Sequence, residues 1–193
     1  MAQQVTNESG RGVRAISQFA PMYFRKFLTC DETLEFTQLG KQLSPSPCTV
    51  EQDYYEARRS LGADVDPKSL PVGLQSRIDE IAQVANSTFG FDLLCAPPDL
   101  CFLRYGRDDF FEWHHDVGEQ TENIRKVSFS IQLSDPFDYD GGDLAFAAMK
   151  SPSIAKELGT LVIFPAFNMH CVQPVTRGVR FSLVGWFYGP KFR

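Results

Sequence analysis

Long apolar runs are missing from this 193-residue sequence, and no stretch approaches the roughly 20 residues that a membrane-spanning helix needs. An excess of positive charge is missing too, because 19 Lys and Arg face 24 Asp and Glu, which gives a net charge of −5. A general phosphate-binding surface is therefore disfavoured. These absences lead us to expect no membrane association and no nucleic-acid partner.

Cysteine is sparse and irregularly spaced. The five cysteines are an odd number without a Cys-x-x-Cys pair, which argues against a disulfide framework and against a structural zinc site. The first ten residues lack a basic start followed by an apolar core, so we expect no signal peptide. Reduced thiols in a cytoplasmic protein are the resulting expectation. The five positions are Cys30, Cys48, Cys95, Cys101 and Cys171.

What the sequence does contain is typical of one globular domain. Hydrophobic residues make up 43% of the chain and 17 residues are Phe, which is enough for a sizeable core. Residues 1–18 are polar and lack periodicity, so we expect a loose tail there. No linker divides the remainder, and nothing in the sequence indicates an oligomeric state.

Hydrophobic periodicity predicts helices in the first half of the chain and strands in the second. We expect one helix over residues 31–39 with Asp31 as its N-cap, and a clearer one over residues 74–88. Short alternating segments separated by Gly and Pro turns follow, which favours two antiparallel sheets with the helices packed outside. The expected strands cover residues 100–105, 126–133, 144–147, 159–164 and 179–188, with a turn at 135–142 and a helical turn at 151–158.

The chain has three histidines, and two of them occur in a pattern that suits a metal ion. In an extended backbone residues i and i+2 point the same way, so His114 and Asp116 would project from one face. Such a tripeptide alone is weak evidence, because a histidine beside a strand is more often structural. His170, at the end of a later apolar segment, supplies a third candidate ligand. Two His and one carboxylate leave open positions on a metal, which is the ligand set of non-haem Fe(II) oxygenases.

A basic strand follows the last histidine. Alternation puts Arg180 and Ser182 on one face of this segment, and in a barrel wall that face would be shared with the metal. A guanidinium there costs several kcal/mol unless a carboxylate meets it. A dicarboxylate cosubstrate would do so, since Arg offers a bidentate fork and Ser182 can add a hydroxyl donor.

At this point the sequence resembles a known family over residues 98–188, the Fe(II)/2-oxoglutarate dioxygenases of the prolyl 4-hydroxylase type. Two upstream segments, residues 58–60 and 86–92, are similar to the microbial peptidyl-proline-hydroxylase-like branch. The residues that carry the main resemblance are Tyr105, Phe111, His114, Asp116, Arg125, Leu133, Gly141, Gly142, His170, Gly178, Arg180 and Ser182.

The resemblance implies an α+β, mainly β fold: a double-stranded β-helix, which is a jelly-roll or cupin-like barrel. Residues 98–190 would form the catalytic barrel, and residues 19–97 would supply helical support and a possible flap over residues 48–70. All 193 residues would then form a single dioxygenase domain.

The resemblance also implies cofactors and residue roles. The cofactors are Fe(II), 2-oxoglutarate and O2, with ascorbate as reductant, and the Fe(II) ligands are His114, Asp116 and His170. Arg180 would bind the far carboxylate of 2-oxoglutarate. The remaining cosubstrate contacts would come from Ser182, Tyr105 and Gln132. Gln132 departs from the family pattern, which often has Tyr there, although an amide can also donate to a carboxylate.

The activity implied is hydroxylation of an unactivated C–H bond, with succinate and CO2 as co-products. Asp116 favours hydroxylation, because halogenating relatives replace this carboxylate with a small residue. Proline in a peptide or protein is the first substrate that the resemblance suggests. Two alternatives stay open: a hydroxylase of a free amino acid or small metabolite, and a cupin-like metal-binding module without turnover. A plain metal binder has no use for an inward Arg180.

Overall fold

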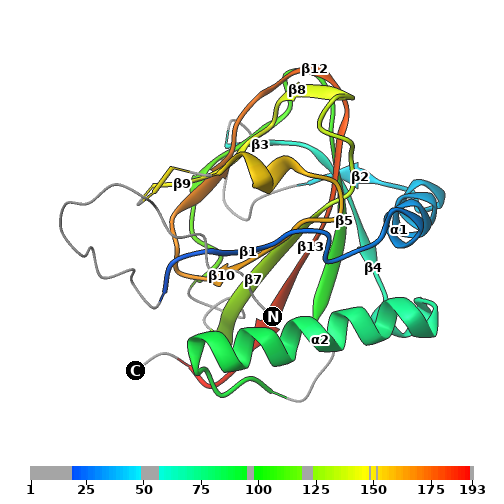
Figure 1. Ribbon diagram of the computed structural model, residues 1–193. Helices are drawn as coiled ribbons and strands as arrows, with labels where there is room; N and C mark the ends of the chain where they lie inside the picture. The colour runs from blue at the N-terminus through cyan, green and yellow to red at the C-terminus, as the bar shows by residue number, and fades with distance from the viewer. Residues whose placement is uncertain are drawn as a thin grey trace, which may run out of the picture.

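The computed structural model describes residues 19–48, 57–94, 98–118, 124–147, 149–150 and 152–191, and the tail expected over residues 1–18 lies outside them. Two antiparallel sheets dominate this part of the chain, and two α-helices pack on the outer face of the larger sheet (Figure 1). The expected mainly β architecture, a sandwich consistent with a jelly-roll, is confirmed.

Within the described residues the larger sheet has seven strands in the order β1-β10-β7-β13-β5-β4-β2, all paired antiparallel. Its central strands, β7 and β13, pair from Ser182 opposite Gln132 to Tyr188 opposite Arg125, with one register shift between Phe187 and Tyr188. The strands are β1 (Met22–Phe24), β2 (Ser46–Pro47), β4 (Leu61–Val65), β5 (Asp99–Tyr105), β7 (Arg125–Gln132), β10 (Leu161–Pro165) and β13 (Arg180–Tyr188).

The smaller sheet has the order β3-β6-β11-β9, and β8 and β12 form a separate antiparallel pair. These strands are β3 (Arg58–Arg59), β6 (Phe110–His114), β9 (Leu144–Phe146), β11 (His170–Val172), β8 (Tyr139–Gly141) and β12 (Val175–Gly178). A turn was expected over residues 135–142, but residues 139–141 of it form the strand β8. Gly141 permits this pairing, because its φ is +72° and a Cβ would lie 2.2 Å from the Pro174 carbonyl oxygen.

The larger sheet is buried on both faces, because alternate residues of its strands pack into two different clusters. On β5, Phe102 faces the helices and Leu103 faces the space between the sheets. On β7 the apolar set that includes Phe129 faces the helices, whereas Ser128 and Ser130 are buried on the inner side. Small hydroxyl residues on an inner face leave room for a site there.

The second helix, α2 (Val72–Phe89), confirms the helix expected over residues 74–88. Its apolar stripe packs against the outer face of the larger sheet, and Figure 1 shows the helix lying across the lower end of the strands. It ends at Gly90, whose φ of +65° is the left-handed conformation that glycine accommodates. The buried stripe consists of Leu74, Ile78, Ile81, Ala85 and Phe89.

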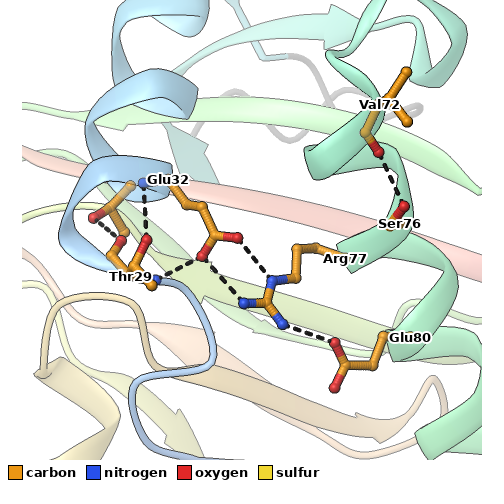
Figure 2. Close-up of polar contacts among 7 residues, drawn as sticks. Thr29, Glu32, Val72, Ser76, Arg77 and Glu80 are labelled. Carbon is orange, nitrogen blue, oxygen red and sulfur yellow. Dashed lines mark hydrogen bonds and ion pairs between the residues drawn. The ribbon is translucent and has the colours of Figure 1, made fainter.

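The first helix is α1 (Cys30–Gln42), and its N-cap is Thr29, two residues before the expected N-cap Asp31. The Thr29 hydroxyl accepts from the Glu32 backbone N–H at 3.2 Å, and the Glu32 carboxylate accepts from the Thr29 N–H at 2.8 Å. The same carboxylate accepts from Arg77 of α2 at 2.8 and 3.4 Å, so one side chain caps α1 and joins the two helices (Figure 2). Arg77 also donates to Glu80 at 3.0 Å.

Two short 3-10 helices complete the described elements, η1 (Pro67–Ser69) and η3 (Ser153–Lys156), and η3 matches the helical turn expected at 151–158. A flap was expected over residues 48–70, but residues 58–59 and 61–65 of this segment are paired in strands. β3 pairs with β6, and β4 pairs with β5, so residues 58–65 are built into both sheets. Residues 49–56 lie outside the described residues.

Candidate active site

The three candidate metal ligands come together between neighbouring strands of the smaller sheet. β6 and β11 pair antiparallel with His114 opposite His170, and Asp116 follows directly after β6. Each residue offers a donor atom, and these atoms all lie within 4.8 Å of one another. The His114 Nε2 atom lies 3.5 Å from one Asp116 carboxylate oxygen, and the His170 Nε2 atom lies 3.7 Å from the other.

Hydrogen bonds orient both imidazoles with Nε2 toward the shared centre. The His114 Nδ1 atom lies 2.7 Å from the Glu112 carbonyl oxygen, and the His170 Nδ1 atom lies 2.8 Å from the Asn168 carbonyl oxygen. A carbonyl can only accept, so each Nδ1 carries the proton and each Nε2 lone pair is left for a ligand bond. This is the tautomer that a metal site requires.

The protonation states also suit a metal. Burial alone would raise the pKa of the Asp116 carboxyl, but His170, His114 and the Ser128 hydroxyl, which donates at 2.5 Å, hold this pKa below its usual range. Burial lowers the pKa of His170, against the opposing pull of the Asp116 carboxylate. A carboxylate and a neutral imidazole are the forms that bind a cation.

These three residues fit Fe(II). The donor set is two imidazole nitrogens and one carboxylate, gathered on one side of a pocket whose other walls carry no further His, Cys, Asp or Glu among the described residues. That composition is the facial triad, in which the remaining coordination positions stay open. His115 is turned elsewhere, with its Nδ1 2.6 Å from the Phe167 carbonyl oxygen.

The pocket continues from the triad to the inner face of β13. Arg180 and Ser182 both line it, as alternation had predicted, and their exposed fractions are 4% and 0%. The Arg180 Nη1 atom donates to the Ser182 hydroxyl at 3.3 Å, and no carboxylate among the described residues forms an ion pair with this guanidinium. A buried, unmatched guanidinium beside a metal site fits an anionic ligand that the pocket receives.

Tyr105 lies opposite Arg180 in the β5–β13 register, and its ring centroid is 5.5 Å from the guanidinium carbon. Its exposed fraction is 1%, and burial raises the pKa of the phenol, with the positive charges of Arg58 and Arg180 acting against the rise. The hydroxyl therefore stays protonated and can donate.

Gln132 is buried on the same strand face as Ser128 but does not line the pocket. Its amide nitrogen donates to the Tyr139 hydroxyl at 2.8 Å. Tyr139 is 1% exposed, and burial raises the pKa of its phenol while Arg180 lowers it. Tyr139 thus connects the Gln132 amide to the Arg180 guanidinium.

Six of the seven residues expected at the site line this one pocket: His114, Asp116, His170, Arg180, Ser182 and Tyr105. Comparison with known proteins adds an independent finding, because residues 100–188 match the sequence model of the 2OG-Fe(II) oxygenase superfamily. Residues 100–188 form a 2OG-Fe(II) oxygenase domain. This segment contains all six of the expected residues that line the pocket.

Curated relatives of this oxygenase domain are PKHD-type hydroxylases. The protein from Synechococcus sp. (strain CC9902) is 39% identical over 79 residues, which is 40% of this chain and 36% of that one. The protein from Shewanella frigidimarina is 32% identical over 126 residues, which is 62% of this chain and 54% of that one. The chain thus spans about a third to a half of the length of these relatives.

Solved structures share the fold of the oxygenase domain and its helices. A Pseudomonas putida prolyl-4-hydroxylase gives a TM-score of 0.68 at 22% identity, covering 88% of this chain and 92% of that one. A viral collagen prolyl hydroxylase from Paramecium bursaria Chlorella virus-1 gives 0.66 at 17% identity, covering 88% and 96%. At these identities the likeness establishes the fold.

Two residues of the oxygenase site were not identified from the sequence. Ser128 was seen there only as a polar position in an alternating strand, and its bond to Asp116 depends on how β7 lies beside the loop after β6. Tyr139 fell within an expected turn, where a buried tyrosine has no periodic signal. The alternation of Ser128, Ser130 and Gln132 opposite an apolar set was the available sign of an inner polar face.

Proposed function

We propose that this protein is an Fe(II)- and 2-oxoglutarate-dependent dioxygenase that hydroxylates an unactivated C–H bond, with proline in a peptide or protein as its substrate. The observation that carries the proposal is the pairing, in one pocket, of a His-Asp-His group with a buried guanidinium that has no carboxylate partner among the described residues. A metal-binding module without turnover would gain nothing from burying Arg180.

His114, Asp116 and His170 would hold Fe(II), with Ser128 and the two backbone carbonyls fixing their orientation. When bound, Fe(II) couples the oxidative decarboxylation of 2-oxoglutarate by O2 to hydroxylation of the substrate, giving succinate and CO2.

The chain's own contribution is to bind and orient the cosubstrate. Arg180 offers its fork to the far carboxylate of 2-oxoglutarate, and Ser182 adds a hydroxyl beside it. Tyr105 can donate its phenol to the same ligand. Gln132 supports this arrangement through Tyr139 rather than by direct contact. These groups are buried, so 2-oxoglutarate would replace its hydrogen bonds to water with hydrogen bonds to donors that the protein holds in place.

Three further parts of the proposal rest on the composition and on the relatives. Among the solved structures similar to this chain is a prolyl hydroxylase from Trichoplax adhaerens in complex with a peptide fragment, which supports a peptide substrate. Ascorbate would serve as reductant. The four cysteines among the described residues are free thiols, which suits a reducing cytoplasmic location. No helix in the described part of the chain is long and apolar enough to span a membrane.

The test is a turnover assay with Fe(II), ascorbate, O2 and 2-oxoglutarate, in which proline-containing peptides and free amino acids are screened for a mass gain of one oxygen. We expect succinate in equal amount to a hydroxylated peptide. A hydroxylated free amino acid instead would move the assignment to a metabolite hydroxylase. Binding of Fe(II) without binding of 2-oxoglutarate and without succinate would favour the non-catalytic module.

A further inference from the structure

The turn between β10 and β11, residues 166–169, contacts two of the three metal ligands through its backbone. The Ala166 carbonyl oxygen accepts from the Asp116 backbone N–H at 2.9 Å, and the Asn168 carbonyl oxygen accepts from the His170 Nδ1–H at 2.8 Å. The first bond fixes the chain that carries the carboxylate, and the second fixes the rotation of the imidazole. A displacement of this turn would therefore move two donor atoms at once.

The two ends of this turn are attached to strands, and its middle is not. One end is bonded to β7 and the other to the residue that follows β9. Phe167 and Asn168 lie between these attachments, and both are half-buried. Side-chain contacts of these two residues therefore influence where the Asn168 carbonyl points. The attachments are the Ala166 N–H to the Lys126 carbonyl oxygen and the Ala147 N–H to the Met169 carbonyl oxygen, each at 3.0 Å.

The middle of the turn is contacted by Phe19, which precedes β1. β1 pairs antiparallel with β10, with Met22 opposite Ile163, so the chain before β1 continues toward the turn at the end of β10 (Figure 1). The Asn168 Nδ2 atom donates to the Phe19 carbonyl oxygen at 3.0 Å, and the Phe167 ring meets the Phe19 ring edge-on with centroids 5.6 Å apart. One residue thus holds both middle residues of the turn.

A third aromatic ring holds Phe19 in turn. Phe91, which follows α2, stacks on Phe19 with ring centroids 6.0 Å apart and an interplanar angle of 8°, and it meets Phe167 edge-on at 6.5 Å. Phe19 and Phe91 both pack against the apolar cluster between the larger sheet and the helices. The position of the turn is therefore tied to the outer core of the protein as well as to the strands around the pocket.

Resting on the proposed function, we propose that Phe19 and Asn168 are positioning residues for the metal ligands. Contact of Phe19 with the turn sets the direction of the Asn168 carbonyl, and the carbonyl sets the direction of the His170 Nε2 lone pair. Neither side chain lines the pocket, so both act through the turn and not by touching the metal or 2-oxoglutarate.

The size of the effect follows from the distance of these residues from the metal. Loss of a direct hydrogen-bond partner of a metal-bound histidine typically weakens metal binding about 10–100-fold. Phe19 and the Asn168 side-chain amide act one contact further out. Removing either should therefore weaken metal binding by about tenfold, the lower end of that range.

The experiment measures metal binding and metal-free stability side by side. The metal-free full chain is titrated with Co(II), which follows Fe(II) in the affinity series and whose visible absorption reports the arrangement of its ligands. The variants are Asn168→Ala, Phe19→Ala, Phe19→Leu and the double variant of the two Ala substitutions. Phe27→Ala is the matched control, because Phe27 is half-buried, packs on the same apolar cluster as Phe19 and lies 5.7 Å from the Arg77 guanidinium carbon.

Asn168→Ala should weaken Co(II) binding about tenfold and change the absorption of the bound ion, because the carbonyl remains but is no longer held in direction. Phe19→Ala should do the same, and Phe19→Leu should retain part of the affinity. The double variant should weaken binding by less than the product of the two single effects, since both act on one carbonyl. Phe27→Ala should lower the free energy of unfolding and leave Co(II) affinity unchanged.

Unchanged Co(II) affinity and absorption in Asn168→Ala would overturn the inference. This variant alters a half-buried turn and decides the question even if Phe19→Ala does not fold. Equal weakening by Phe27→Ala and Phe19→Ala would also overturn it, because the loss would then follow general stability. In both cases Co(II) binding by the unaltered protein leaves the proposed function standing. Absence of Co(II) binding to the unaltered protein would overturn both.

Discussion

Each metal-ligand side chain is held by a backbone or hydroxyl partner that belongs to the barrel and not to a metal. His114 and His170 are fixed by carbonyl oxygens, and Asp116 by Ser128. The apolar clusters on both faces of the larger sheet supply the stability. The fold should therefore not depend on the metal, unlike that of a zinc finger.

We predict that His114→Ala, Asp116→Ala and His170→Ala each abolish stoichiometric Fe(II) binding while the circular dichroism spectrum stays that of the unaltered protein. His115→Ala is the matched control and should bind Fe(II) normally, because its Nδ1 faces the Phe167 carbonyl. Unfolding of the metal-free protein, or of all three variants, would make the metal a structural element.

Tyr139 and Gln132 form a buried pair behind Arg180. Tyr139→Phe should leave the Gln132 amide nitrogen with only the weaker Ser134 carbonyl contact at 3.4 Å, at a cost of about 1–3 kcal/mol in the free energy of unfolding. It should also weaken 2-oxoglutarate binding, since Arg180 loses a neighbour that fixes it.

A double-mutant cycle checks the coupling of this pair. With Gln132→Leu as the second substitution, denaturant unfolding should show that the double variant loses less stability than the sum of the two single variants. Additive losses would mean that the hydrogen bond between the two side chains contributes nothing.

At the scale of the elements, Glu32 links the two helices, and this link depends on its charge. The hydrogen bond from Arg77 holds the pKa of Glu32 below its ordinary value of 4.5, against the opposing effect of burial. A carboxyl whose pKa is lowered in the folded state adds stability above its unfolded pKa, and the contribution is lost as the pH falls through the folded value. Glu32 therefore stabilises the helices at neutral pH and not in strong acid.

Glu32→Gln should lower the free energy of unfolding at pH 7 by about 1 kcal/mol, because both partners are partly exposed. The difference from the unaltered protein should shrink as the pH is lowered below 4.5. Glu35→Gln, on an exposed position of the same helix, is the control. A difference that does not change with pH would assign the effect to the helix cap alone.

Within residues 48–70, the part that is paired in the sheets begins at β3. Residues 58–65 are paired in both sheets and should be protected from hydrogen exchange whether or not a substrate is bound. A flap that orders on binding would have to lie before residue 58. If hydrogen exchange of residues 58–65 slows markedly when a peptide substrate is added, these strands belong to the flap as well.

At the scale of the whole molecule, periodicity and spacing predicted most of what positions the site. The alternation of Arg180 and Ser182 predicted which face of their strand meets the metal ligands. The apolar stripe of α2 predicted which face of that helix packs on the sheet. Thr29 as N-cap was missed because Asp31, only two residues later, is an equally good capping residue. Local patterns distinguish such alternatives poorly.

Long-range contacts could not be read from the chain. Arg58 comes to the pocket because β3 pairs with β6, and Ser128 reaches Asp116 because β7 lies behind the loop after β6. These neighbours are separated by many residues and follow no period. Tyr139 likewise enters the core through the pairing of β8 with β12.

The central claim is that a buried guanidinium exists in this pocket to bind 2-oxoglutarate. It is tested most directly by calorimetric titration of the Fe(II)-loaded protein with 2-oxoglutarate, in the absence of O2, for the unaltered chain, Arg180→Gln and the exposed control Arg177→Gln. We predict that Arg180→Gln weakens binding by about one to two decades, corresponding to roughly 1.5–3 kcal/mol, with Fe(II) binding retained and Arg177→Gln unchanged. Equal 2-oxoglutarate affinity in all three proteins would contradict the account.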